Sequence, residues 1–487
     1  MTFEPPNEHY CEPPATRRRA GLLCHIGSLT TPGFGQAARD LLDFLDLSGL
    51  SVWQVLPLGP THPDGSPYQC LSSFALEPAY LDAEGLADDP AFEASVSVAE
   101  RRAGCGANRA LRGAFNRFRR HEAHWLEDYV RFMAIRIEQD DRPWHEWPAG
   151  LRDRDSDALQ RFEERHAGRI KAIAFEQFLL DRQWRALRQH ARRRSLCLFG
   201  DLPIFVAGDS ADVWANRPLF QLDQTGKPTV VAGVPPDYFS ATGQRWGNPL
   251  FDFAQMAEDG FSWWKTRLLR HLQLYDWVRI DHFRGLSAYW AIPAEDDDAA
   301  GGEWIAAPGE ALLEALASVV DGALPLVAED LGVITPEVTA LRDRFDLPGM
   351  TVLQFAFDGG EDNPHLPNHH RAHSVAYTGT HDNDTTLGWW HSLDDATRTF
   401  VHRRLEDLQG IDPGSPMPDA LIESVLTSDA SLAMLPVGDL LGLGSEARIN
   451  VPGTCEGNWR WQLPAGALNA VLAERIRGWL ARHDRLL

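Results

Sequence analysis

The sequence has little cysteine and lacks any long apolar run. Its six cysteines, at positions 11, 24, 70, 105, 197 and 455, are scattered over 487 residues and form no CxxC pair. In a chain of this size they are typical of small buried apolar side chains in a reducing compartment. No run approaches the about 20 apolar residues of a membrane span, and Gly, His and Ser interrupt the apolar segment after the arginines at 17–19. We therefore expect a cytoplasmic protein without membrane contact.

Positive charge is also scarce. Lys and Arg total 46 against 69 Asp and Glu, which gives a net charge of -23. Because polyanions repel such a protein, we expect neither nucleic acid nor an anionic membrane as a partner. Tryptophan, in contrast, is abundant at 17 residues. Indole rings build cores, and they also stack on the apolar faces of sugars.

Several common site motifs are missing. The sequence has no phosphate-binding loop and no GxSxG nucleophile elbow, and the glycines at 33 and 35 lack the third glycine of a dinucleotide fingerprint. His369 and His373 are four residues apart, but no acidic residue stands where a zinc protease needs one, and Pro364 and Pro367 lie just upstream. This pattern favours a surface loop over a zinc site. We expect no metal and no cofactor.

Eight short apolar runs recur along the chain, and most end in polar residues. They occupy residues 21–29, 51–59, 195–206, 277–285, 324–332, 350–357, 374–384 and 432–444. Continuous apolar runs are typical of parallel strands that are buried on both faces. Helical segments, such as those at 35–49, 262–276 and 309–320, lie between them. This alternation predicts the α/β class and a (β/α)8 TIM barrel.

Two connections are too long for simple crossovers. The one between the second and third runs contains charged helical stretches, so we expect a helical insertion subdomain at about 84–190. The one after the third run is rich in Gly, Pro and aromatic residues and predicts an active-site loop region at about 207–253. Residues 1–20 are expected to form an irregular N-terminal segment, and residues 21–487 the barrel that these two regions interrupt.

Polar residues end four of the runs, where a TIM barrel carries its catalytic groups. They are Asp201, then Arg279, Asp281 and His282, then Glu329 and Asp330, and then His381, Asp382, Asn383 and Asp384. A lone Asp at a strand end is more often a helix cap or an ion-pair partner. Acidic groups from four strands on one rim repel one another, so their clustering indicates a metal site or acid/base chemistry.

Glycoside cleavage fits this set of carboxylates and the abundant tryptophan. A retaining enzyme needs a carboxylate nucleophile and a protonated carboxyl group about 5–5.5 Å apart. Asp281 follows Arg279 by two residues on the same strand face, and this arginine would keep its carboxylate ionised by lowering its pKa. Glu329 follows an apolar lead, which would raise its pKa and suit it to be the acid.

Several motifs together resemble one family. They are SPYQ (66–69), GDLPIFV (200–206), GVPPDYFSATGQRWGNP (233–249), RIDHFRG (279–285), AEDLG (328–332), THDND (380–384) and INVPGT (449–454). These motifs are similar to those of the amylomaltases, the 4-α-glucanotransferases or disproportionating enzymes of the α-amylase clan. The matches run from about residue 21 to residue 461, and the long 233–249 motif is nearly diagnostic of amylomaltases within the clan.

The resemblance implies a role for each matching residue. Asp281 would be the nucleophile that forms a glucosyl-enzyme, Glu329 the general acid and then the base, and Asp382 the third carboxylate, which binds sugar hydroxyls. Arg279, His282 and His381 would hold the sugar in the cleavage subsite. The glucan cleft would be lined by Tyr68, Asp201, Asp237, Gln244, Trp246 and Asn450. The aromatic loop at 236–246 would help to exclude water.

The chain departs from the family pattern in two places. CHIGSL (24–29) stands where the family usually has HPTSLPG or similar, and Glu77 stands where it usually has an asparagine before a proline. Both places concern donor-sugar contacts near the first two strands.

Residue spacing alone does not separate transfer from hydrolysis, because either water or a sugar hydroxyl can resolve a covalent intermediate. The resemblance favours transfer, with maltooligosaccharides and α-1,4-glucans as donor and acceptor. The alternatives are an α-glucan hydrolase of the same clan and a non-catalytic glucan-binding protein.

Overall fold

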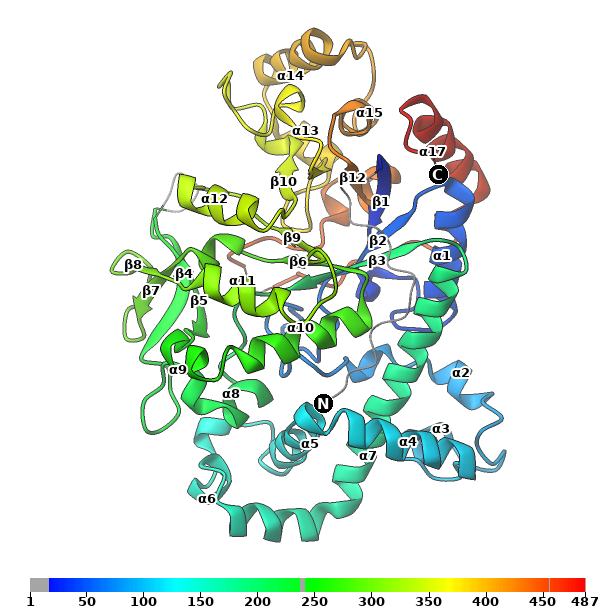
Figure 1. Ribbon diagram of the computed structural model, residues 1–487. Coiled ribbons are helices and arrows are strands. Elements are labelled where there is room, and N and C mark those ends of the chain that lie inside the picture. The colour runs from blue at the N-terminus through cyan, green and yellow to red at the C-terminus, as the bar shows by residue number, and fades with distance from the viewer. Residues whose placement is uncertain (1–16, 237–240, 455, 487) are drawn as a thin grey trace.

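Eight parallel strands form the centre of the molecule (Figure 1). The computed structural model describes residues 17–236, 241–454 and 456–486. The eight strands are β1 (Arg19–Leu23), β2 (Val52–Gln54), β3 (Cys197–Leu202), β6 (Trp277–Ile280), β9 (Leu326–Ala328), β10 (Gly349–Val352), β11 (Ser374–Tyr377) and β12 (Leu432–Pro436). Each of the eight apolar runs overlaps one of them, so the predicted (β/α)8 barrel is confirmed.

The sheet runs in the order β10-β11-β12-β1-β2-β3-β6-β9 and nearly closes on itself. The N–H of Ala328 in β9 donates to the carbonyl of Pro348, just before β10, at 2.9 Å, so these end strands also meet. A closed parallel sheet leaves no free edge and buries both faces of every strand, which explains why the runs are apolar without alternation.

Helices surround this barrel on its outer side. The helices at the three segments predicted from the sequence are α1 (Gln36–Ser48), α10 (Ser262–Leu274) and α11 (Gly309–Ala317). The others that follow barrel strands are α12 (Pro336–Arg344), α13 (Thr386–Ser392), α14 (Asp395–Gln409), α15 (Asp419–Thr427), α16 (Val437–Leu440) and α17 (Ala470–Arg482). Helix α17 packs beside α1, so the last helix covers the barrel next to the first one.

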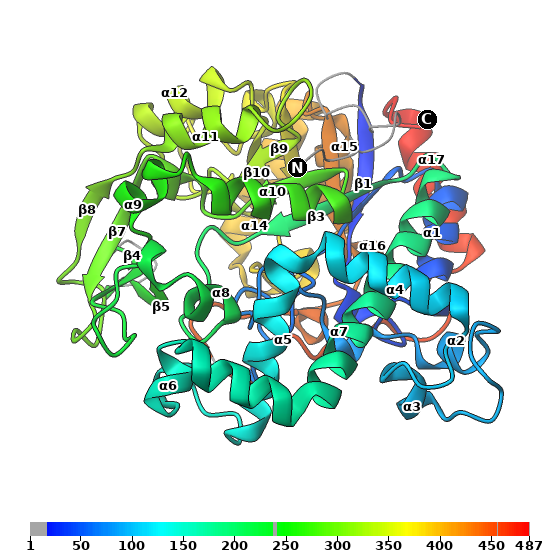
Figure 2. The same ribbon diagram turned by 60° about the horizontal axis from the view of Figure 1, so that its bottom comes forward.

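The connection between β2 and β3 forms six helices. They are α2 (Ala83–Ala87), α3 (Val98–Arg102), α4 (Arg109–His121), α5 (Ala123–Glu138), α6 (Ala149–Arg152) and α7 (Ser156–Arg192). In Figure 2 they project to one side of the barrel. Helix α7 returns the chain to β3, and its Asp181 accepts from Arg270 of α10 at 3.0 Å, an ion pair that is almost fully buried. The boundaries of an insertion subdomain at about 84–190 stay a prediction.

The region after β3 differs from the predicted loop. It forms α8 (Ala211–Ala215), β4 (Val230–Val234), β5 (Gln244–Pro249) and α9 (Phe253–Glu258). The two strands join β7 (Ala288–Pro293) and β8 (Glu303–Ala306) in an antiparallel sheet of order β5-β4-β7-β8. The strand that stabilises β4 is β7, which comes from a distant part of the chain, so the Gly-rich local sequence did not indicate a sheet.

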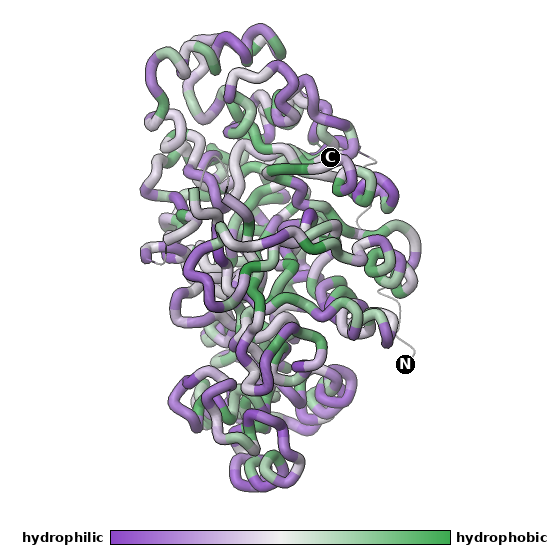
Figure 3. The backbone as a smooth tube through the Cα atoms, turned by 90° about the vertical axis from the view of Figure 1, so that its left-hand side faces the viewer, coloured by the Kyte–Doolittle hydropathy of each residue, from purple (hydrophilic) through white to green (hydrophobic). Residues whose placement is uncertain are grey.

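Inward-facing residues change from apolar to polar along each central strand. Cys197 and Phe199 of β3, together with Trp277 of β6, belong to an apolar cluster inside the barrel. Two residues further on in each strand come Asp201 and Arg279, which are paired in the register of β3 and β6. Figure 3 shows the apolar positions gathered along the interior strands and the polar ones on the outer helices. The barrel therefore places its charged groups at the carboxyl ends of the strands.

No helix in the described ranges is long and apolar enough to cross a membrane. Cys24 is a buried free thiol, as expected, whereas the free thiol of Cys105 is exposed. Cys197 is buried inside the barrel. The expectation of small buried cysteines is therefore wrong for Cys105, because the packing of an isolated cysteine cannot be read from the sequence. The cytoplasmic location stays a prediction.

Two glycines provide a matched test of the barrel packing. A Cβ atom at Gly200, in β3, would overlap the ring of Tyr275, whereas a Cβ at Gly478, in α17, would meet no atom within 4 Å. We expect Gly200→Ala to destabilise the protein by about 1–3 kcal/mol and Gly478→Ala to stabilise it by about 0.4–1 kcal/mol. Urea unfolding of both variants measures this, and equal stabilities would contradict the close packing of Tyr275 on β3.

Candidate active site

An arginine shared by two carboxylates lies at the centre of the site. Arg279 Nη1 contacts both oxygens of Asp201 at 2.8 Å and Oδ1 of Asp281 at 2.9 Å. Asp201 is 0% exposed and Arg279 4%. Burial alone would lower the pKa of Arg279, but Asp201 and Asp281 outweigh it and hold that pKa well above its usual range. The guanidinium therefore stays charged beside Asp281.

Asp281 is more accessible than the other members of this cluster. It comes directly after β6, its N–H donates to the carbonyl of Leu202 at 3.0 Å, and its side chain is 28% exposed. One carboxylate oxygen faces Arg279, and the exposure leaves the group reachable from the cleft. A carboxylate with this partner and this access can act as a nucleophile.

Glu329 lies next to Asp281 because of an unusual backbone turn. His282 has φ 52°, the left-handed region that few residues other than glycine adopt. Its N–H donates to Glu329 Oε2 at 2.6 Å, and the N–H of Leu331 donates to Oε1 at 3.0 Å. Burial and the charge of Asp281 nevertheless raise the pKa of Glu329 to about 8. The group is therefore protonated at neutral pH and can give a proton to a leaving group.

Asp382 contributes a third carboxylate from the loop after β11. Its Oδ1 accepts from Asn450 Nδ2 at 2.6 Å, and its Oδ2 lies 3.4 Å from His381 Nε2. The side chain is 48% exposed, so most of its hydrogen-bonding capacity remains open to a ligand. An exposed carboxylate of this kind can accept hydrogen bonds from sugar hydroxyls.

Aromatic rings line the site between these carboxylates. Tyr68 stacks on His381 with centroids 5.1 Å apart, and Trp459 lies 6.0 Å from Tyr68 and 6.1 Å from His381. Tyr68 also donates to Asp201 at 2.7 Å. Across the site, the ring of Trp246 meets His282 edge-on at 4.8 Å. The rings provide apolar surface on which the faces of a sugar can pack.

A family model described as 4-alpha-glucanotransferase matches residues 24–468. The chain belongs to the 4-alpha-glucanotransferase family. The resemblance to amylomaltases is therefore confirmed.

Relatives of similar length support this membership. The 4-alpha-glucanotransferase of Thermus thermophilus is 47% identical over 498 residues, which cover 96% of this chain and 99% of the relative. That of Synechocystis sp. is 41% identical over 96% of each chain. Among solved structures, the amylomaltase of Streptococcus agalactiae in complex with acarbose matches with a TM-score of 0.89 and 29% identity, over 97% of this chain and 100% of the other.

The structure brings together most residues that the family motifs indicated. The three carboxylates Asp281, Glu329 and Asp382 lie on one rim with their neighbours Tyr68, Arg279, His282, His381 and Asn450. Gln244 and Trp246 follow on β5, where Trp246 Nε1 donates to Gln244 Oε1 at 3.2 Å. Asp201 is fully buried beneath Tyr68 and Arg279, whereas a residue that lines a cleft is exposed to it. Asp237 lies outside the described residues.

Other strand-end residues have structural partners. Asp330 pairs with Arg342 and accepts from the N–H of Met350 at 2.7 Å. Asn383 Oδ1 accepts from the N–H and the hydroxyl of Thr380, each at 2.9 Å, and so closes the turn before it. Asp384 does not cap α13, since Thr385 is the capping residue.

The two departures from the family pattern have different surroundings. Glu77 accepts from the N–H groups of Thr61 and Ala79 at 2.8 and 2.9 Å, so it secures its own loop. His25, within CHIGSL, is buried, and its ring lies 6.5 Å from Trp459. The CHIGSL departure therefore lies against the aromatic wall of the site.

The histidine pair considered for zinc has other partners. His373 Nδ1 lies 3.2 Å from Asp346 Oδ1, and His369 Nδ1 contacts the carbonyl of Asn363 at 2.8 Å. Among residues 17–236, 241–454 and 456–486, no group of three or more His, Cys, Asp or Glu could hold a metal ion.

Two residues of the site were missed by sequence reasoning. Trp459 completes the aromatic wall, and Arg448 binds the main chain of Asp382. Both flank the INVPGT motif, which was used to recognise the family. The charged and aromatic residues next to that motif were a signal that could have found them.

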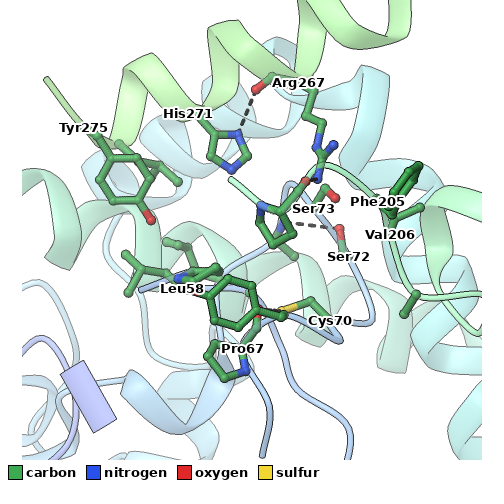
Figure 4. A pocket seen from close by; sticks show the side chains of 18 residues that line it. Leu58, Pro67, Cys70, Ser72, Ser73, Phe205, Val206, Arg267, His271 and Tyr275 are labelled. Atoms are coloured by element: carbon green, nitrogen blue, oxygen red, sulfur yellow. Dashed lines mark hydrogen bonds between the residues drawn. The ribbon is translucent and has the colours of Figure 1, made fainter. Parts of the chain in front are cut away.

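Figure 4 shows a small cavity whose lining includes Tyr68 but none of the three carboxylates. Its labelled lining includes Pro67, Cys70, His271 and Tyr275. It offers about 30 Å³ to the centres of water-sized molecules, enough for about two waters. This space is too small for a sugar ring, so the cavity is not the glucan cleft.

The raised pKa of Glu329 makes stability depend on pH. Its folded-state pKa of about 8 exceeds the ordinary 4.5, so the folded state binds the extra proton and wild-type stability is lost as pH rises from about 5 through 8. Glu329→Gln has no such proton to lose. We expect its melting temperature, measured relative to wild type, to increase over this range, whereas Glu474→Gln on α17 should track wild type. A constant difference for Glu329→Gln would contradict the raised pKa.

Proposed function

We propose that this protein transfers α-1,4-glucan segments between maltooligosaccharides by a retaining double displacement. Membership of the 4-alpha-glucanotransferase family supports the reaction. The observation that carries the mechanism is the contrast between two neighbouring carboxyl groups: Asp281 lies 2.9 Å from a charged arginine, whereas the pKa of Glu329 is raised to about 8. A double displacement requires one ionised and one protonated carboxyl group.

In the first step, the Asp281 carboxylate attacks the anomeric carbon of the donor, and the bond to the glycosidic oxygen breaks. Glu329 gives its proton to that oxygen, so the leaving glucan departs as an alcohol. In the second step, ionised Glu329 removes the proton from the hydroxyl of an acceptor glucan. The acceptor oxygen then attacks the same carbon and releases Asp281, which restores both groups and retains the anomeric configuration.

The proposed role of Asp382 is to bind hydroxyls of the sugar in the cleavage subsite. Its open carboxylate and the nearby His381 support this role. Hydrogen bonds to ring hydroxyls that strengthen in an oxocarbenium-like transition state lower the barrier rather than only tighten binding. Arg279 and His282 lie at the same subsite, and burial lowers the pKa of His282 to about 4, which keeps its imidazole neutral.

Hydrolysis of α-glucans is the second candidate, because the same three carboxylates support it. Water and an acceptor hydroxyl compete for one intermediate, and exclusion of water decides the product. The rings of Trp246 and Trp459 on two sides of the site favour transfer, since apolar walls disfavour a free water molecule and fit a sugar face. A non-catalytic glucan-binding protein has no need for a carboxyl group with a raised pKa, Glu329, next to a carboxylate that contacts an arginine, Asp281.

The proposed reaction predicts a distinctive product pattern from maltotriose. Transfer should give glucose and a ladder of longer maltooligosaccharides, with the number of reducing ends unchanged. Asp281→Asn should lose at least about 10⁴-fold in kcat, since nucleophile removal stops the covalent step, while its melting temperature stays close to that of wild type. Shorter sugars alone would indicate a hydrolase, and a ladder from Asp281→Asn would remove Asp281 from the nucleophile role.

The proposed role of Asp382 predicts a different balance of effects. Asp382→Asn should reduce kcat by about 100-fold or more, as for a group that acts in the transition state, and change maltooligosaccharide binding and thermal stability far less. Initial rates measure kcat, calorimetric titration measures maltooligosaccharide binding, and thermal unfolding measures stability, all on the same preparation. If Asp382→Asn lost stability to the same degree as it lost kcat, residues 381–384 would instead form a turn with a structural role.

A further inference from the structure

The third carboxylate is held from a distance by the C-terminal part of the chain. Asp382 lies on the loop after β11, and its side chain is 48% exposed. Within its own loop, its N–H donates to Thr380 Oγ1 at 3.3 Å, a long hydrogen bond. A half-exposed side chain on such a loop needs contacts from elsewhere to keep one orientation.

Arg448 supplies a main-chain contact to this loop. Its Nη2 donates to the carbonyl oxygen of Asp382 at 2.8 Å, and its Nε donates to the carbonyl oxygen of Asn450 at 2.8 Å. One planar guanidinium thus joins two backbone segments, and Arg448 and Asp382 are 66 residues apart in sequence. A charged donor makes stronger hydrogen bonds than a neutral one, and the rigid fork of arginine fixes the angle between the two segments.

The side chains at both ends of this bridge then meet. Asn450 Nδ2 donates to Asp382 Oδ1 at 2.6 Å. Arg448, Asn450 and Asp382 therefore form a closed ring of contacts: the arginine aligns the two backbones, and the amide and the carboxylate bond across them. Removal of the arginine leaves the amide–carboxylate bond as the main restraint on Asp382.

Further hydrogen bonds hold the segment that follows Arg448. The N–H of Trp459 donates to the carbonyl of Ile449 at 2.7 Å, and the N–H of Val451 donates to Asn458 Oδ1 at 2.9 Å. These bonds close the loop between 449 and 459, so the residue next to Arg448 is also tied to the Trp459 that packs on His381. Arg448 thus lies between two structures that both face the cleavage subsite.

We propose that Arg448 is a positioning residue for the transferase reaction, which sets the orientation of the Asp382 carboxylate through the main chain of residues 382 and 450. This inference rests on the proposed role of Asp382. Arg448 contacts carbonyl oxygens rather than the carboxylate, so it acts through Asp382 and not on the sugar. A misplacement of about 1 Å in a catalytic group lowers the rate by about 100-fold.

A double-mutant cycle with maltotriose and with a maltosyl fluoride, whose better leaving group keeps slow variants measurable, tests this inference. Arg448→Met should lower kcat by about 100-fold with KM changed less than threefold and thermal unfolding close to that of wild type. In an Asp382→Ala background, the same substitution should lower kcat no further. The kcat of Arg448→Lys should lie between those of wild type and Arg448→Met, because one ammonium group cannot reproduce both hydrogen bonds in the same geometry.

Arg403→Met on the exposed side of α14 is the matched control and should leave kcat unchanged. If Arg448→Met does not fold, the cycle is run with Arg448→Lys. The inference would be overturned if the Arg448 substitution lowered kcat by the same factor in the wild-type and Asp382→Ala backgrounds, or if it changed KM alone. The proposed role of Asp382 would stand in either case. Full activity of Asp382→Ala alone would overturn both.

Discussion

The arrangement of the site depends on the ion pairs of Arg279. This arginine lies between the buried Asp201 on β3 and the accessible Asp281 after β6. Three charges in a nearly closed barrel are stable only when each has a partner, and removal of one partner from such a group costs about 3–5 kcal/mol. Tyr68, whose hydroxyl donates to Asp201, ties the loop after β2 to the same group. Arg279 therefore both holds the rim together and contacts the carboxylate that is proposed as the nucleophile.

Two neighbouring carboxyl groups, Asp281 and Glu329, have different surroundings. Asp281 has a cation at 2.9 Å and partial access to solvent, whereas Glu329 is enclosed and feels the negative charge of Asp281. Two backbone N–H groups bind Glu329, but they do not outweigh burial in setting its pKa. The left-handed turn at His282 aims one of these N–H groups and brings the acid close to the nucleophile.

Local sequence patterns predicted the barrel but not the second sheet. Strands such as β3 and β6 are short apolar runs that end in a charged residue, and their burial on both faces makes them recognisable. Strands β4 and β5 contain glycine and polar residues, and β4 pairs with β7, which comes from a distant part of the chain. Motifs also located Asp281, Glu329 and Asp382. They did not reveal the depth of Asp201 or the contacts of Arg448 and Trp459, because those depend on partners far away in the chain.

The sequence by itself determined the class of fold, the family and the identity of the three carboxylates, because runs, charges and motifs are local properties. Only the tertiary structure decided that Glu329 has a raised pKa, since that pKa depends on burial and on a charge from another strand. It also decided that Arg448, near the end of the barrel, reaches the loop of Asp382. Closure of the barrel brings β12 beside β11, and residues 382 and 448 meet for that reason.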